Sequence, residues 1–158
     1  MGFWAGTIGC MEHPAVALSG DGAAAMNIQE FATLKYYNLP LKLFIYQNNG
    51  YMLIRHNQHN YMDDRFLGVG PDSGVQTPDY CKAAEAYGLP HIRIQASDDI
   101  EKKIAQALVM EGPVICEVIL EEFGELAPRI ASRVMPDGSL KAAEFDDLYP
   151  FLEPGDEQ

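Results

Sequence analysis

Basic residues are scarce in this chain of 158 residues. Eleven lysines and arginines stand against 23 aspartates and glutamates, which gives a formal net charge of −12. Binding to nucleic acids and to anionic membranes depends on cationic groups that neutralise phosphates. We therefore expect no nucleic-acid partner and no membrane partner.

Long apolar runs are also missing. No stretch approaches the roughly 20 apolar residues that a membrane-spanning helix needs, and the first residues do not show the basic and then apolar pattern of a secretory signal. These two absences predict a cytoplasmic protein.

Cysteine is rare, with three residues that lie far apart at Cys10, Cys81 and Cys116. No Cys-x-x-Cys pair is present, so a zinc ribbon or a dithiol redox centre is not expected. We predict buried free thiols, most clearly for Cys116, which lies inside an apolar run.

The chain nevertheless has enough apolar residues, 47% of the total, to build the core of one domain of ordinary size. Four apolar runs of strand length alternate with helical patterns. The runs lie at 15–18, 41–46, 91–94 and 114–120, and the helical patterns at 26–37, 79–88 and from 97 or 98 to 112. We expect Asp79 to cap the second helix and Ser97 or Asp98 to cap the third. This alternation predicts an α/β fold with an open, mostly parallel sheet and helices on both faces.

Two stretches depart from the alternation. Residues 47–78 are polar and too long for an ordinary connection, which is typical of a functional lid or binding loop. Residues 121–158 are rich in proline and acids and are expected to form an extended arm with one helical turn at 146–149. We thus expect an α/β domain at 1–120 and a C-terminal arm at 121–158 that packs on it.

Two polar motifs follow neighbouring strands. Gly20-Asp21-Gly22 comes at the end of the first strand, and Asn48-Asn49-Gly50 at the end of the second. The first motif alone is equally typical of a tight turn with an aspartate cap. The carboxyl ends of parallel strands meet at one sheet edge, so Asp21 and Asn48 should lie close together. A carboxylate, an amide oxygen and a nearby backbone carbonyl suit Mg²⁺.

Gly20-Asp21-Gly22, followed after 25 residues by Asn48-Asn49, resembles the thiamine diphosphate motif of the acetolactate synthase and pyruvate decarboxylase superfamily. Nearly the whole chain shares the resemblance to acetolactate-synthase-like enzymes. Its further segments lie at 26–33, 38–42, 49–55, 70–74 and 136–140. The implied fold is the C-terminal thiamine-diphosphate-binding domain of these enzymes, which agrees with the α/β pattern.

The resemblance implies roles for particular residues. Asp21, the Asn48 side chain and the Gly50 backbone carbonyl would be ligands of a divalent metal, Mg²⁺, that bridges to the cofactor diphosphate. The residues expected to bind the cofactor are Gly20, Asp21, Gly22, Ala23, Asn48, Gly50 and Tyr51. The segment Met1-Gly2-Phe3 resembles the place where the family supports the bent cofactor.

The resemblance also implies that the site is one half of an active centre. In the family, a glutamate that activates the coenzyme lies on a pyrimidine-binding domain of a neighbouring subunit, and no residue of this chain matches its motif. The chain would therefore act as a lyase or transferase on a 2-oxo acid, by decarboxylation or carboligation, only when a partner or self-association completes the site. Two alternatives are a subunit of a two-chain 2-oxo acid decarboxylase and a non-catalytic interaction module that keeps the fold.

Charged residues in the long polar segment leave further alternatives open. Arg55 could bind an anionic substrate carboxylate through its bidentate fork, or form a salt bridge with Asp63 or Asp64. His56 and His59 are more typical of a solvated pair than of metal ligands, because no third ligand lies at metal-site spacing.

Overall fold

The computed structural model describes residues 14–125, 127–130, 132–135, 137–142 and 148–150. The chain divides into two compact units between Phe123 and Gly124.

The first unit is built on a four-stranded parallel sheet with the order β1-β2-β4-β3. Its strands are β1 (Ala15–Gly20), β2 (Leu41–Gln47), β3 (His91–Ile94) and β4 (Val114–Ile119). All four predicted strands are therefore confirmed. Gly20 pairs with Tyr46, so the chain leaves β1 and β2 at the same edge of the sheet.

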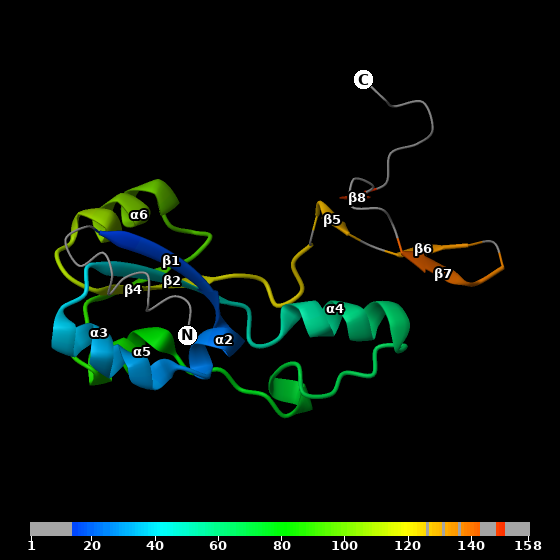
Figure 1. The fold of residues 1–158 in the computed structure, drawn as a ribbon, viewed down its shortest axis with the longest axis horizontal. Helices are drawn as coiled ribbons and strands as arrows, with labels where there is room; N and C mark the ends of the chain where they lie inside the picture. The colour runs from blue at the N-terminus through cyan, green and yellow to red at the C-terminus, as the bar shows by residue number, and fades with distance from the viewer. Residues whose placement is uncertain (1–13, 126, 131, 136, 143–147, 151–158) are drawn as a thin grey trace, which may run out of the picture. The chain divides into compact units, whose positions relative to one another are not determined.

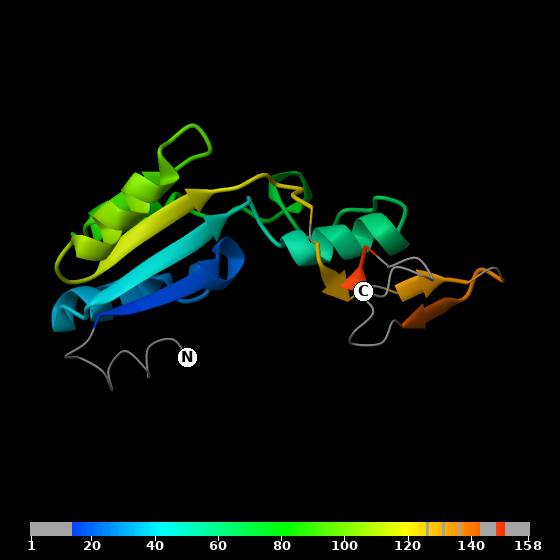
Figure 2. The ribbon, with the colours of Figure 1, turned by 90° about the horizontal axis from the view of Figure 1, so that it is seen from above.

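Helices cover both faces of the sheet, as predicted (Figures 1 and 2). The α-helices are α2 (Asp21–Ala25), α3 (Phe31–Tyr37), α4 (Met52–Tyr61), α5 (Tyr80–Ala86) and α6 (Ile100–Val109), and the 3₁₀ helices are η1 (Ile28–Glu30) and η2 (Pro71–Ser73). Figure 1 shows α3 and α5 on one face and α6 on the other.

Each face of the sheet has its own apolar core. Under α3 and α5, the cluster includes Phe31, Leu34, Ile45, Tyr80 and Ile115. Under α6, the cluster comprises Phe44, Ile92, Ile94, Ala107, Val114 and Cys116. Successive strand residues point to opposite faces, which explains why β2 and β4 contribute to both clusters and read as continuous apolar runs.

The helix predicted at 26–37 is wrong in its extent. Helix α2 already begins at Asp21, and the later part is divided into η1 and α3. The cap predicted for α6 is also wrong, because Asp99 accepts the Lys102 backbone N–H. The cap predicted for α5 is confirmed, since the Asp79 side chain accepts the Lys82 backbone N–H.

The polar segment 47–78 contains a ten-residue helix, α4, that the sequence analysis missed. Within α4 only Arg55 is buried, so this helix has no apolar stripe to produce a helical period. Figure 2 shows α4 beyond the end of β2.

The second unit contains two small antiparallel sheets. Strand β5 (Arg129–Ile130) pairs with β8 (Leu148–Tyr149), and β6 (Ser132–Val134) pairs with β7 (Leu140–Ala142). The helical turn predicted at 146–149 is therefore wrong at 148 and 149, while 146 and 147 lie outside the described residues. Leu148 and Tyr149 instead pair with Ile130 and Arg129 of β5, and the Arg129 guanidinium lies over the Tyr149 ring. The packing of this arm on the domain stays a prediction.

In the part of the chain that the structure describes, no helix is long and apolar enough to span a membrane.

Candidate functional site

Asp21 links the two polar motifs. It is the first residue after β1, and its side chain is 1% exposed. Its Oδ1 accepts the Gly22 backbone N–H (2.7 Å), and its Oδ2 accepts the backbone N–H groups of Asn48 (3.1 Å) and Gly50 (2.9 Å). The structure thus brings together the two motifs that the sequence placed at one sheet edge.

Asn48 is buried beside Asp21, and its Oδ1 has no hydrogen-bond partner among the described residues. Its Nδ2 lies 3.6 Å from the Met52 sulfur. A buried amide oxygen without a donor costs about 1–3 kcal/mol, so such atoms are rare in native structures. A cation would satisfy this oxygen, and the neighbouring Asp21 carboxylate supplies the negative charge that a divalent cation requires.

The turn that follows Asn48 requires glycine at position 50. Gly50 has φ +136°, and a Cβ atom there would lie 2.1 Å from the Val69 carbonyl oxygen. The Tyr51 N–H donates to the same oxygen (2.9 Å). The turn is therefore packed directly against the backbone of a loop that comes about 20 residues later.

All seven residues predicted to bind the cofactor line one hollow of about 410 Å³. Its remaining lining residues are Met26, Tyr46, Met52, Leu53, Ile54 and Leu120. Within the hollow, the Tyr51 ring lies over the Gly22 backbone, since a Cβ on Gly22 would be 2.4 Å from the ring. The wall is thus mostly apolar, with polar groups concentrated at Asp21 and Asn48.

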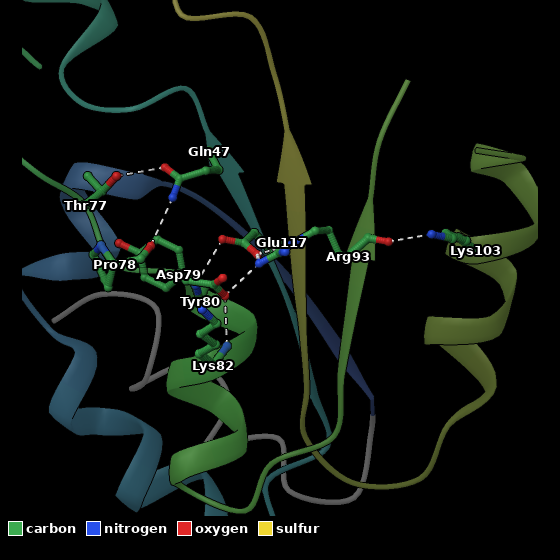
Figure 3. Close-up of polar contacts among 9 residues, drawn as sticks. All are labelled: Gln47, Thr77, Pro78, Asp79, Tyr80, Lys82, Arg93, Lys103 and Glu117. Carbon is green, nitrogen blue, oxygen red and sulfur yellow. Dashed lines mark hydrogen bonds and ion pairs between the residues drawn. The ribbon is translucent and has the colours of Figure 1, made fainter. Parts of the chain in front are cut away.

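A hydrogen-bonded brace that the sequence did not predict supports Asp21. Figure 3 shows its members Gln47, Thr77, Pro78 and Tyr80. The Thr77 hydroxyl donates to Gln47 Oε1 (2.9 Å) and lies 3.5 Å from Asp21 Oδ2, and Gln47 Nε2 donates to the Pro78 carbonyl (3.0 Å). The Tyr80 hydroxyl donates to the Asp21 backbone carbonyl. Gln47 directly precedes the motif residue Asn48, whereas Thr77, Pro78 and Tyr80 belong to no predicted motif and only the fold brings them to Asp21.

An ion-pair network anchors the start of α5 next to this brace (Figure 3). Glu117 on β4 is 1% exposed, accepts from Arg93 on β3 (2.7 and 2.8 Å) and accepts the Tyr80 backbone N–H (3.0 Å). Arg93 also pairs with Asp79 (2.6 Å). The Lys82 backbone N–H, which caps onto Asp79, lowers the pKa of that carboxyl, and the Arg93 guanidinium lowers it further.

Asp79, Cys81 and Glu117 also place one possible metal-ligand atom each within 4.8 Å of the others. Arg93, however, already provides the positive charge at both carboxylates. Burial raises the pKa of the Cys81 thiol to about 12, so the thiolate that a metal needs is disfavoured. Asp79 and Glu117 therefore belong to the Arg93 ion-pair network, and Cys81 is a free buried thiol beside it.

The prediction of buried free thiols is confirmed for the two cysteines that the structure describes. Cys81 and Cys116 are free and buried, and burial raises the pKa of the Cys116 thiol to about 12. Cys10 and the segment Met1-Gly2-Phe3 lie outside the described residues.

Both interpretations of Arg55 are wrong. Arg55 is buried and donates to backbone carbonyls, so it is not free for a substrate carboxylate, and Asp64 pairs with His59 (2.5 Å). His56 stacks on Phe123, with ring centroids 4.3 Å apart. His59 packs against the same ring in a T-shaped arrangement. The two histidines are α4 residues held by these contacts.

The family that this fold and site define is identified by its sequence profile. The profile "Thiamine pyrophosphate enzyme, C-terminal TPP binding domain" matches residues 1–118. The chain therefore belongs to the thiamine pyrophosphate (thiamine diphosphate) enzyme family, and it carries the C-terminal cofactor-binding domain of that family.

Individual relatives agree with this family. Acetolactate synthase 2, chloroplastic, of Nicotiana tabacum is 32% identical over 129 residues, which cover 79% of this chain and 19% of the relative. The acetolactate synthase of Arthrospira platensis is 29% identical over 122 residues, which cover 75% of this chain and 21% of the relative. This chain thus spans about a fifth of the length of these relatives.

A solved structure shares the fold. The thiamine diphosphate-dependent 4-hydroxybenzoylformate decarboxylase of Rhodococcus jostii RHA1 superposes with a TM-score of 0.65 at 22% identity, over 76% of this chain and 22% of that chain. At this identity the likeness shows the fold alone, and it confirms the predicted α/β architecture.

Proposed function

We propose that the hollow between Asp21 and Tyr51 binds thiamine diphosphate through Mg²⁺. The observation that carries this proposal is the buried Asn48 Oδ1, which has no partner among the described residues and lies on a turn bound to a buried carboxylate. Membership of the thiamine pyrophosphate enzyme family supports the choice of cofactor.

Each residue predicted to bind the cofactor would have a defined task. Asp21, Asn48 and the Gly50 carbonyl would hold the metal, and the backbone of Gly22 and Ala23 would lie next to the diphosphate. Gly20 and Tyr51 would contribute the adjoining wall. The predominantly apolar lining would exclude water from the bound cofactor.

The activity we propose is decarboxylation or carboligation of a 2-oxo acid, as in an acetolactate-synthase-like enzyme. When bound, thiamine diphosphate supplies an electron sink for the carbanion that such chemistry generates. Asp21 is the one carboxylic acid among the described residues that line the hollow, and it is already bound by three backbone N–H groups. A glutamate from a pyrimidine-binding domain would therefore have to complete the active centre.

Calorimetric titration of the purified chain with thiamine diphosphate, with and without Mg²⁺, tests the proposal. We expect metal-dependent binding that Asp21→Asn weakens at least about 10-fold, because the variant removes the charge that faces the metal. Asp63→Asn is the matched control, since Asp63 is exposed and its φ of +48° suits asparagine.

Two results would contradict this assignment of the site. One is that Asp21→Asn binds thiamine diphosphate with the wild-type affinity, and the other is that the wild-type affinity is the same with and without Mg²⁺. No binding by the wild-type chain would contradict a preformed site and favour the interaction module.

A further inference from the structure

The side chain of Arg55 has an unusual environment. It is 8% exposed, and its guanidinium donates to backbone carbonyls from three segments. Nη1 contacts the carbonyls of Asn48 (3.5 Å) and Glu122, and Nη2 contacts those of Asn49 (3.2 Å) and Val69 (3.2 Å). Among the described residues, no carboxylate forms an ion pair with it.

The surrounding backbone is shaped to accept this guanidinium. A Cβ atom on Gly70 would lie 2.4 Å from Arg55 Nη2, so an alanine there would displace the group. Burying a cation without an anion is costly unless many polar groups solvate it. The carbonyl cage supplies those groups, and a planar fork of five donors is suited to binding several acceptors at once.

We propose that Arg55 is a positioning residue for the metal-binding turn, an inference that rests on the function proposed above. The turn is held from two sides. The Asp21 carboxylate accepts the N–H groups of Asn48 and Gly50, while Arg55 binds the carbonyls of Asn48 and Asn49. With its peptide groups held on both sides, the turn presents the Asn48 oxygen to a metal without first having to be ordered.

Removal of this support should weaken metal binding. Partners that orient metal ligands typically contribute about 10- to 100-fold to affinity, and we expect a loss of that size for Mn²⁺ in Arg55→Met and Arg55→Lys. Lysine keeps the positive charge but lacks the planar fork of donors. A similar loss of Mn²⁺ affinity in both variants would therefore show that the geometry of the guanidinium matters, and not its charge alone. Arg65→Met is the matched control, because Arg65 is exposed and follows the same helix.

Gly70→Ala approaches the same contact from the other side. It leaves Arg55 in the chain but displaces its guanidinium, so it should weaken Mn²⁺ binding in the same direction. In the double variant Arg55→Met/Gly70→Ala the loss should not exceed that of Arg55→Met alone, because both changes remove one interaction. Additive losses would overturn the proposal.

The experiment measures Mn²⁺ affinity by the electron paramagnetic resonance signal of the free ion, with thiamine diphosphate present, together with the unfolding free energy of each variant. Hydrogen exchange is then followed at the Asn48, Gly50 and Tyr51 amides, whose acceptors are Asp21 and Val69. Unchanged Mn²⁺ affinity in folded Arg55→Lys and Gly70→Ala, or an equal loss in Arg65→Met, would overturn the proposal.

The exchange rates distinguish this proposal from the proposed function. If the wild-type chain binds no Mn²⁺, the proposed function fails. The exchange rates of the Asn48, Gly50 and Tyr51 amides still show whether Arg55 holds the turn in place. Faster exchange at these amides in Gly70→Ala and Arg55→Lys than in Arg65→Met would support positioning by Arg55, and equal exchange would overturn it.

Discussion

Gly50 is the residue where backbone conformation and ligand geometry are most closely linked. Its φ of +136° is unfavourable for any side chain, and the position a Cβ would occupy is filled by the Val69 carbonyl oxygen. Backbone atoms cannot move aside as a flexible side chain can, so substitution must deform the turn itself.

We therefore predict that Gly50→Ala lowers the unfolding free energy by about 3 kcal/mol, from backbone strain and overpacking together. Gly68→Ala is the control, because Gly68 has φ +66° but no atom within 4 Å of a Cβ, and it should cost about 1 kcal/mol. Urea denaturation measures both values. Equal losses in the two variants would contradict the role of the Val69 contact.

At the scale of elements, the start of α5 connects the sheet to the site. The Asp79 cap and the Arg93–Glu117 pair fix the first turn of α5, whose Tyr80 hydroxyl binds the Asp21 backbone. If the start of α5 became disordered, Asp21 would lose its contact with the Tyr80 hydroxyl. It would also lose the neighbouring contact with Thr77, which lies three residues before Tyr80.

The lowered pKa of Asp79 makes this anchor pH-dependent. In the unfolded chain an aspartate has a pKa of about 4, and in the folded chain the hydrogen bond from the Lys82 N–H, followed by the contact with Arg93, holds the pKa of Asp79 lower. Its contribution to stability is thus fully present above that unfolded pKa and is lost as the pH falls through the folded pKa.

We predict that Asp79→Asn, which keeps a capping oxygen but loses the charge, is less stable than the wild type at pH 7 by about 1 kcal/mol. The difference should shrink as the pH falls from about 4 through the lower pKa of the folded state, because the wild-type carboxyl then becomes protonated as well. Unfolding free energies between pH 7 and 3 measure this, with Asp63→Asn as the control. A difference that stays constant with pH would contradict the assignment.

At the scale of the whole molecule, the face of the sheet next to α6 has an open apolar hollow of about 330 Å³. Its lining includes Val16 and Leu18 of β1 and Ile100, Ile104 and Leu108 of α6, and Leu18 is 51% exposed. Apolar surface of this kind favours association, whereas a net charge of −12 opposes it.

We predict self-association that strengthens with ionic strength, because salt screens the repulsion between copies. Leu18→Glu should shift the equilibrium toward monomer, while Leu67→Glu, at a residue 79% exposed outside the hollow, should shift it much less. Sedimentation velocity at micromolar concentrations at two salt concentrations tests this. A monomer in both salts, or equal effects of the two variants, would contradict it.

Prediction from the sequence succeeded where a pattern is local. The apolar runs that became β2 and β4 are buried on both faces, and Asp79 is a cap that acts within three residues. Helix α4 was missed because it is mostly exposed and has no apolar stripe. The helical turn predicted at 146–149 was wrong at 148 and 149, because these two residues pair with β5.

The sequence by itself determined the α/β alternation and the two motifs around Asp21 and Asn48, because side-chain period and motif spacing follow the chain. Only the tertiary structure decided that Thr77 and Tyr80 support Asp21, and that the Arg55 guanidinium binds carbonyls instead of a carboxylate. Backbone carbonyls are present at every residue and leave no trace in the sequence. Which of them a buried cation meets depends on how distant segments pack together.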